Sequence, residues 1–89
     1  MVKHIHTSEL EQIARRVWYA KRDVAPRVNG GEEKHASFES MGFSGMSTEF
    51  PMHSGEWRQV GTLEISVSYP KWDVPALIRV RKVSSESRV

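Results

Sequence analysis

Cysteine is absent from this 89-residue chain, so no disulfide cross-links the fold and no thiolate can hold a metal ion or act as a nucleophile. No apolar run approaches the roughly 20 residues that span a bilayer, and the Met1 end lacks the apolar stretch of a signal peptide. These absences predict a cytoplasmic protein that contacts no membrane. Its stability is expected to rest on the burial of apolar side chains.

The length permits one small domain, because so short a chain cannot divide its apolar residues between two cores. Hydrophobic residues make up 38% and charged residues 27%, a balance typical of globular rather than disordered proteins. We expect a single domain over residues 1–83 and a polar C-terminal tail over residues 84–89.

Basic side chains are spread unevenly along the chain, although the net charge is only +2. Residues 35–56 contain no Lys or Arg, yet they hold all three Phe and three of the four Met, interspersed with Gly and Ser. This composition predicts a strand over residues 35–40 and a long loop over residues 41–55. A structureless loop of that length is unusual in so small a domain, so it is either a contact surface or contains a further strand.

The N-terminal part predicts a short strand and a helix. Residues 2–6 alternate apolar and polar side chains, as in a strand. Ser8 and Glu11 have capping-box spacing, so the helix is expected to begin at Ser8. It is expected to end near Val24, because Pro26 disfavours helical geometry in the residue before it. Its apolar face comprises Leu10, Ile13, Ala14, Val17, Ala20 and Val24.

The C-terminal part predicts paired strands. Apolar and polar residues alternate over residues 62–69 and again over residues 76–81, where the outward side chains are mostly cationic. If the two strands pair with both apolar sets buried, Glu64 faces Arg79 or Arg81 across the polar side of the sheet.

Residues 56–60 predict one more strand, which ends at a bulge or bend at Gly61. Together these elements predict an α+β fold in the order β-α-β-β-β. One N-terminal amphipathic helix packs on a three- or four-stranded antiparallel sheet, giving two layers. The other sheet face is then open, either to solvent, to a partner or to a second copy in a homodimer.

The Phe and Met side chains of the cation-free segment are candidates for contact with another protein, because methionine adapts to irregular apolar surfaces. The simpler alternative is that they fill the small core. Trp72 lies between Pro70 and Pro75 at a hairpin tip. There it either folds back on the core edge, which we favour slightly, or acts as an interface anchor. The candidate partner-binding residues are Phe43, Met46, Phe50, Met52 and Trp72.

A second candidate surface is basic and would contact nucleic-acid phosphates. The alternative is a solvated face with internal ion pairs, because Glu11 lies four residues before Arg15 and Glu64 opposes the strand arginines. The candidate residues on the helix and strand faces are Arg15, Tyr19, Arg22, Arg79 and Arg81.

Catalytic and metal-binding signatures are sparse. His4 and His6 share one strand face, but two-residue spacing of histidines is common by chance, and we expect neither a metal ion nor a cofactor. Residues 42–45 fall short of a G-x-S-x-G nucleophile elbow. An enzyme would have to be a small metal-independent ribonuclease that uses His35 or His53.

The leading hypothesis from the sequence is a small non-enzymatic protein–protein interaction module, of accessory or inhibitor type, that masks a larger partner. The alternative is a nucleic-acid-binding module that uses the basic helix and strand faces. A ribonuclease is a remote alternative.

Overall fold

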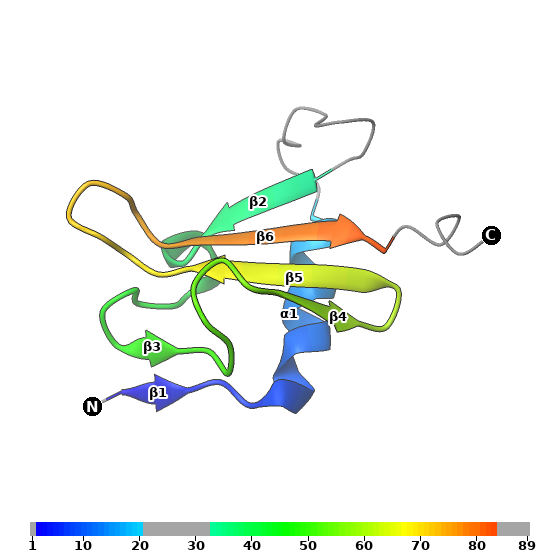
Figure 1. Cartoon of the computed structure of the whole chain (residues 1–89), viewed down its shortest axis with the longest axis horizontal. Helices are drawn as coiled ribbons and strands as arrows, with labels where there is room; N and C mark the ends of the chain where they lie inside the picture. The colour runs from blue at the N-terminus through cyan, green and yellow to red at the C-terminus, as the bar shows by residue number, and fades with distance from the viewer. Residues whose placement is uncertain (1, 21–32, 84–89) are drawn as a thin grey trace.

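The computed structural model describes residues 2–20 and 33–83. One helix packs behind a four-stranded antiparallel sheet, and two short parallel strands lie beside this sandwich (Figure 1). The predicted α+β architecture is confirmed. The predicted tail lies outside the described residues. The elements are β1 (Lys3–His4), α1 (Thr7–Trp18), β2 (Glu33–Ser37), the 3-10 turn η1 (Glu39–Met41), β3 (Thr48–Glu49), β4 (Trp57–Val60), β5 (Leu63–Ser68) and β6 (Leu77–Lys82).

The main sheet has the strand order β2-β6-β5-β4, and every neighbouring pair is antiparallel. The predicted pairing of the two C-terminal strands is confirmed, because Glu64 lies opposite Arg81 and accepts a hydrogen bond of 2.7 Å from its guanidinium. Of the two alternatives for Gly61, a bulge or a bend, the structure has a bend that ends β4. Gly61 has a φ of 67°, which favours glycine, and it reverses the chain in a tight turn between β4 and β5.

Helix α1 begins one residue before the predicted start. His6 is the N-cap, and its backbone N–H donates to the Glu9 carboxylate at 2.9 Å. The residues with capping-box spacing in the sequence, Ser8 and Glu11, therefore both lie inside the helix, where Glu11 pairs with Arg15 one turn later. No helix in the described part of the chain is long and apolar enough to cross a membrane.

The predicted helix end near Val24 is wrong, because α1 ends at Trp18 and Tyr19 has left helical geometry. The ammonium of Lys34 donates to the Trp18 carbonyl at 2.5 Å and lies 4.9 Å from the centroid of the Trp18 ring. A cation from β2 thus satisfies a terminal carbonyl that a longer helix would have satisfied itself. Val24 lies outside the described residues.

The core between α1 and the sheet follows the predicted periodicities. The helix contributes side chains at helical spacing, and β5 and β6 contribute alternate residues. The one polar residue that β5 buries, Ser66, lies on the opposite face of the sheet from these side chains. The buried hydrophobic residues of α1, β5 and β6 are Leu10, Ile13, Ala14, Val17, Trp18, Leu63, Ile65, Val67, Ile78 and Val80.

A cluster of phenylalanine rings extends this core beyond the helix. Phe38 and Phe50 are buried with centroids 5.4 Å apart, and the half-buried Phe43 packs against both at 6.4 and 5.7 Å. Met52 is also buried. The alternative that these side chains fill the small core is therefore right for Phe50 and Met52 and partly right for Phe43. Their inclusion among the partner-contacting residues is wrong for Phe50 and Met52, because both are buried.

The predicted first strand does not join the main sheet. The shorter strand β1 pairs in parallel with β3, and backbone hydrogen bonds of 2.8 Å join Lys3 to Ser47 and Ile5 to Glu49. The predicted loop over residues 41–55 thus contains a strand, β3. This pairing brings the N-terminal residues beside the phenylalanine cluster, since Ile5 belongs to the same buried core.

Replacement of a ring in the cluster tests its structural role. Phe38→Ala is expected to lower the free energy of unfolding by about 3–5 kcal/mol, because it removes a fully buried side chain and leaves a cavity. Met46→Ala, at a position 87% exposed, is the matched control and is expected to change stability by less than about 0.5 kcal/mol. Urea denaturation measures both, and equal effects of the two substitutions would contradict this assignment of the core.

Candidate protein-binding surface

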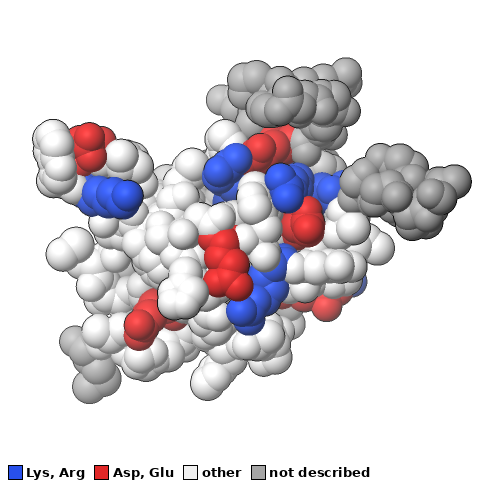
Figure 2. Space-filling model, viewed as in Figure 1, with Lys and Arg blue, Asp and Glu red and all other residues white. Residues whose placement is uncertain are grey.

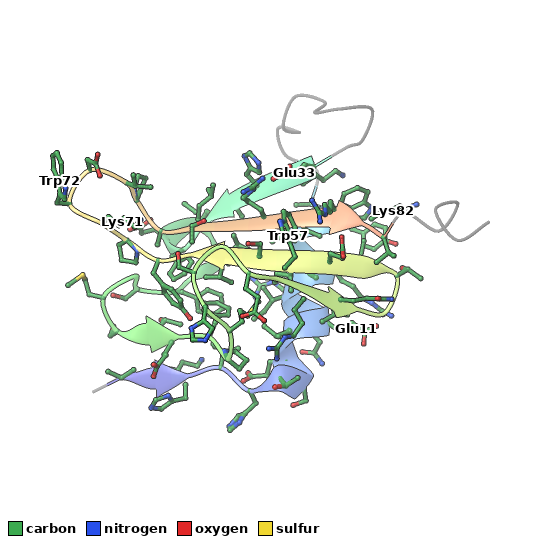
Figure 3. The ribbon with its side chains drawn as sticks, viewed as in Figure 1. Glu11, Glu33, Trp57, Lys71, Trp72 and Lys82 are labelled. Carbon is green, nitrogen blue, oxygen red and sulfur yellow. The ribbon has the colours of Figure 1, made fainter. Side chains whose placement is uncertain are left out.

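The loop between β5 and β6, residues 70–75, forms a short projecting hairpin that we call the finger (Figure 3). The backbone N–H of Lys71 donates to the Val74 carbonyl at 2.8 Å, and that of Val74 donates back to Lys71 at 3.3 Å. A proline on each side of this pair restricts the backbone further. The finger is therefore conformationally restricted, with Trp72 and Asp73 at its tip.

Trp72 is 95% exposed at the tip of the finger. The expectation that its indole folds back on the core edge is wrong. The two-residue turn carries the side chain beyond the end of the sheet, where Figure 3 shows it directed away from the core. An indole held in solvent on a restricted hairpin is the most exposed large apolar side chain in the described part of the chain.

Other exposed apolar side chains lie at the same end of the molecule. Within residues 2–20 and 33–83, five large hydrophobic residues are exposed, and only Tyr19 lies elsewhere, at the C-terminus of α1. The four that gather at this end, which we call the apolar end, are Val2, Met46, Trp72 and Val74.

Two contacts join the segments of the apolar end. The hydrogen bond from Lys3 to Ser47 places the start of β1 beside the segment that carries Met46. That segment packs on the base of the finger at Gly45, where an added Cβ would lie 3.1 Å from the Ala76 Cβ and 3.4 Å from the Pro70 ring. Glycine permits this close approach. The apolar end is thus one surface built from three separate segments.

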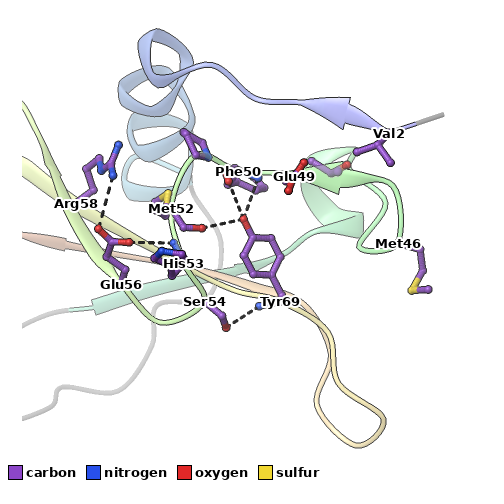
Figure 4. Close-up of a pocket in the computed structure, with 12 residues that line it drawn as sticks. Val2, Met46, Glu49, Phe50, Met52, His53, Ser54, Glu56, Arg58 and Tyr69 are labelled. Atoms are coloured by element: carbon purple, nitrogen blue, oxygen red, sulfur yellow. Dashed lines mark hydrogen bonds and ion pairs between the residues drawn. The ribbon is translucent and has the colours of Figure 1, made fainter.

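An open cleft of about 800 Å³ borders the apolar end (Figure 4). Its lining includes Val2 and Met46 of the apolar end, the aromatic ring of Tyr69, and side chains of the segment between β3 and β4. This volume lies within the roughly 300–1,000 Å³ of ligand pockets. The cleft is large enough to accept a bulky side chain from another molecule.

The hydroxyl of Tyr69 holds one wall of the cleft in place. It accepts a hydrogen bond from the Phe50 backbone N–H at 2.9 Å, and its single hydrogen is shared between the carbonyl oxygens of Phe50 and Met52, which lie 2.9 and 3.1 Å away. Burial raises the pKa of Tyr69, and the nearby Glu49 carboxylate raises it further. The hydroxyl therefore remains protonated at neutral pH and keeps its role as a donor.

The rim of the cleft carries charged groups of both signs. The His53 backbone N–H donates to Glu56 at 2.9 Å, and this bond, with the Arg58 cation 3.6 Å away, lowers the pKa of the Glu56 carboxyl. Glu49 is more available, because its partner at 3.0 Å is the exposed imidazole of His4. Apolar side chains in the lining, beside an available carboxylate, suit an apolar group that lies next to a cation.

The open face of the main sheet is a mixture of charges (Figure 2). The guanidinium carbons of Arg81 and Arg79 lie 3.8 and 5.1 Å from the centroid of the Trp57 ring. Arg81 pairs with Glu64, and Arg79 pairs with Glu33, whose carboxyl pKa it lowers. Each arginine is thus matched by a carboxylate.

The predicted basic residues do not form one surface. Arg79 and Arg81 lie on the open sheet face, whereas Arg15 and Tyr19 belong to the helical layer behind the sheet, and Arg15 pairs with Glu11 at 2.9 Å. Arg22 lies outside the described residues. Separation into two layers, together with the ion pairs, leaves no continuous basic face among the described residues.

The open face also contains two residues that sequence reasoning missed, Ser66 and Trp57. Ser66 is fully buried on this face, and its hydroxyl has no hydrogen-bond partner among the described residues. It lies directly opposite Trp57 in the register of β4 and β5, so the two side chains share the open face. Gly61 was the sequence signal that could have revealed this pairing. A tight hairpin turn at Gly61 fixes the register of β4 against β5 and so places Trp57 opposite Ser66.

The histidines do not assemble into a site. His35 lies on the open sheet face, 3.2 Å from Glu33, whereas His53 lines the cleft. His4 contacts Glu49, and His6 caps the helix. In the part of the chain that the structure describes, no group of three potential ligands is arranged to hold a metal ion.

No protein family, curated protein or solved structure matches this chain.

Tyr69→Phe tests how the cleft wall is held. The substitution removes the hydroxyl that serves three backbone groups, so it is expected to lower the free energy of unfolding by about 1–3 kcal/mol. It is also expected to speed amide hydrogen exchange at Phe50, measured by NMR, without a matching change at Ile65 on β5. Unchanged exchange at Phe50 would show that the hydroxyl does not fix this wall.

Proposed function

We propose that this protein is a small non-enzymatic binding module that docks the apolar end on a larger protein. The observation that carries the proposal is the exposure of Trp72, 95%, on a hairpin restricted by two cross-strand hydrogen bonds. Tryptophan is among the residues that contribute most to protein interfaces, and a restricted loop loses little conformational entropy on binding.

The shape of the apolar end favours a concave binding site on the partner. The finger projects, so Trp72 is the central anchor residue (Figure 3). The exposed Met46 and Val74 add further apolar contacts, of which the methionine is the more adaptable. Accessory and inhibitor proteins that mask a larger partner act in this way, by filling a pocket with a projecting element. The cytoplasmic location expected from the sequence is part of this proposal.

Two of the candidate residues have a different role in this proposal. Phe50 and Met52 are buried, and they support the surface from below rather than contact the partner. The arrangement of the arginines favours protein over nucleic acid as the partner, because each described candidate arginine is paired with a carboxylate.

Trp72→Ala is the direct test. It is expected to weaken binding to the native partner by about 30-fold or more, since an anchor tryptophan contributes about 2 kcal/mol or more, and to leave the melting temperature unchanged. The partner is recovered from source cells with the tagged wild-type protein and identified, and its affinity for each variant is then measured by calorimetry.

Tyr19→Ala is the matched control, because it removes a 70% exposed aromatic ring far from the finger. It is expected to leave the affinity unchanged. A partner that binds Trp72→Ala as tightly as it binds the wild type would overturn the proposal. Retention on RNA that is lost in Arg79→Glu would instead support a nucleic-acid-binding module.

A further inference from the structure

The apolar end contains both a projecting side chain and a cleft, side by side. The finger begins at Pro70, directly after Tyr69, whose ring lines the cleft. Met46 belongs to both features, because it is exposed at the apolar end and also lines the cleft. The projection and the cavity therefore share one edge of the molecule.

The chemistry of the finger complements that of the cleft. The finger presents the Trp72 indole with the Lys71 cation directly before it, and Lys71 forms no ion pair within the described residues. The cleft offers the half-buried ring of Tyr69 and the exposed side chains of Val2 and Met46 in its lining, with the Glu49 carboxylate beside them. An aromatic ring beside a cation is the group that this cleft suits.

The finger does not occupy the cleft of its own chain. The paired backbone bonds between Lys71 and Val74 close the turn at the tip, and the indole remains almost wholly in solvent. The finger and the cleft complement each other but do not meet within one molecule. They can meet between two molecules that are related by a two-fold axis.

We propose that this protein forms a symmetric homodimer in which Trp72 of each copy enters the cleft of the other and Lys71 pairs with Glu49 across the interface. In this arrangement each finger occupies the cleft of the other copy, so no finger or cleft is left free to bind a third copy. The interface is therefore closed and does not grow into a filament. This dimer differs from the one expected through the open sheet face.

Self-association hides the same tryptophan that the larger partner needs. Partner binding and dimer formation therefore compete for the apolar end. This inference goes beyond the proposed function, and it stands or falls independently of it, because it requires only the pure protein.

Sedimentation equilibrium of the pure protein from micromolar to millimolar concentration tests the dimer. The wild type is expected to shift from monomer to dimer, and Trp72→Ala is expected to raise the dissociation constant by about 30-fold or more. Tyr19→Ala is the control and is expected to leave it unchanged. Circular dichroism checks that each variant is folded.

A charge exchange tests the proposed register. Lys71→Glu and Glu49→Lys are each expected to raise the dissociation constant by about 5- to 10-fold, and the double variant is expected to regain most of the wild-type affinity. A wild type that remains monomeric at millimolar concentration overturns the proposal. So does a dimer that Trp72→Ala leaves intact, which would indicate a different face.

The Glu49→Lys variant separates this inference from the proposed function, because it disfavours the dimer but keeps Trp72 exposed. Capture of the larger partner by a wild type that never dimerises overturns the dimer alone. A wild type that dimerises, with a monomeric Glu49→Lys variant that binds no partner, supports the dimer and contradicts the proposed function alone.

Discussion

Coverage of the sheet by a short helix is the constraint on which this structure depends. Helix α1 has 12 residues, so it is about 18 Å long, and the chain has no disulfide to compensate for an incomplete core. The phenylalanine cluster fills the space that the helix does not cover, and the pairing of β1 with β3 holds it in place. The composition of the cation-free segment is thus explained first by packing.

Because α1 and the phenylalanine cluster together fill the core, they determine which apolar side chains remain exposed. Phe38, Phe50 and Met52 are buried, whereas Met46, between η1 and β3, remains exposed. The Tyr69 hydroxyl joins this segment to the end of β5, where the finger begins. The same bonds that complete the core therefore place the cleft next to Trp72, and the candidate binding surface follows from the way the core is closed.

Period-2 and period-3.6 patterns predicted the fold where burial alone decides, as in α1, β5, β6 and the pairing of Glu64 with Arg81. They failed where a long-range contact decides. Lys34 caps α1 from another strand, and β3 is a strand only because β1 lies beside it. Exposure of Trp72 depends on how far the hairpin tip extends from the sheet. Pro70 and Pro75 indicated the hairpin but not the extent of its projection. Among the five candidate contact residues, sequence alone did not distinguish Phe50 and Met52, which are inside, from Met46, which is outside.

The central claim is that the finger holds Trp72 in solvent while the other large rings complete the core. Its most direct test is the NMR signal of each tryptophan indole N–H in dilute protein as a soluble paramagnetic relaxation agent is added. The account predicts that the Trp72 signal is lost first and that the signal of Trp18, which is 7% exposed, persists longest. A Trp72 signal as well protected as that of Trp18 would show that the finger is folded onto the core, and it would remove the basis of the binding surface.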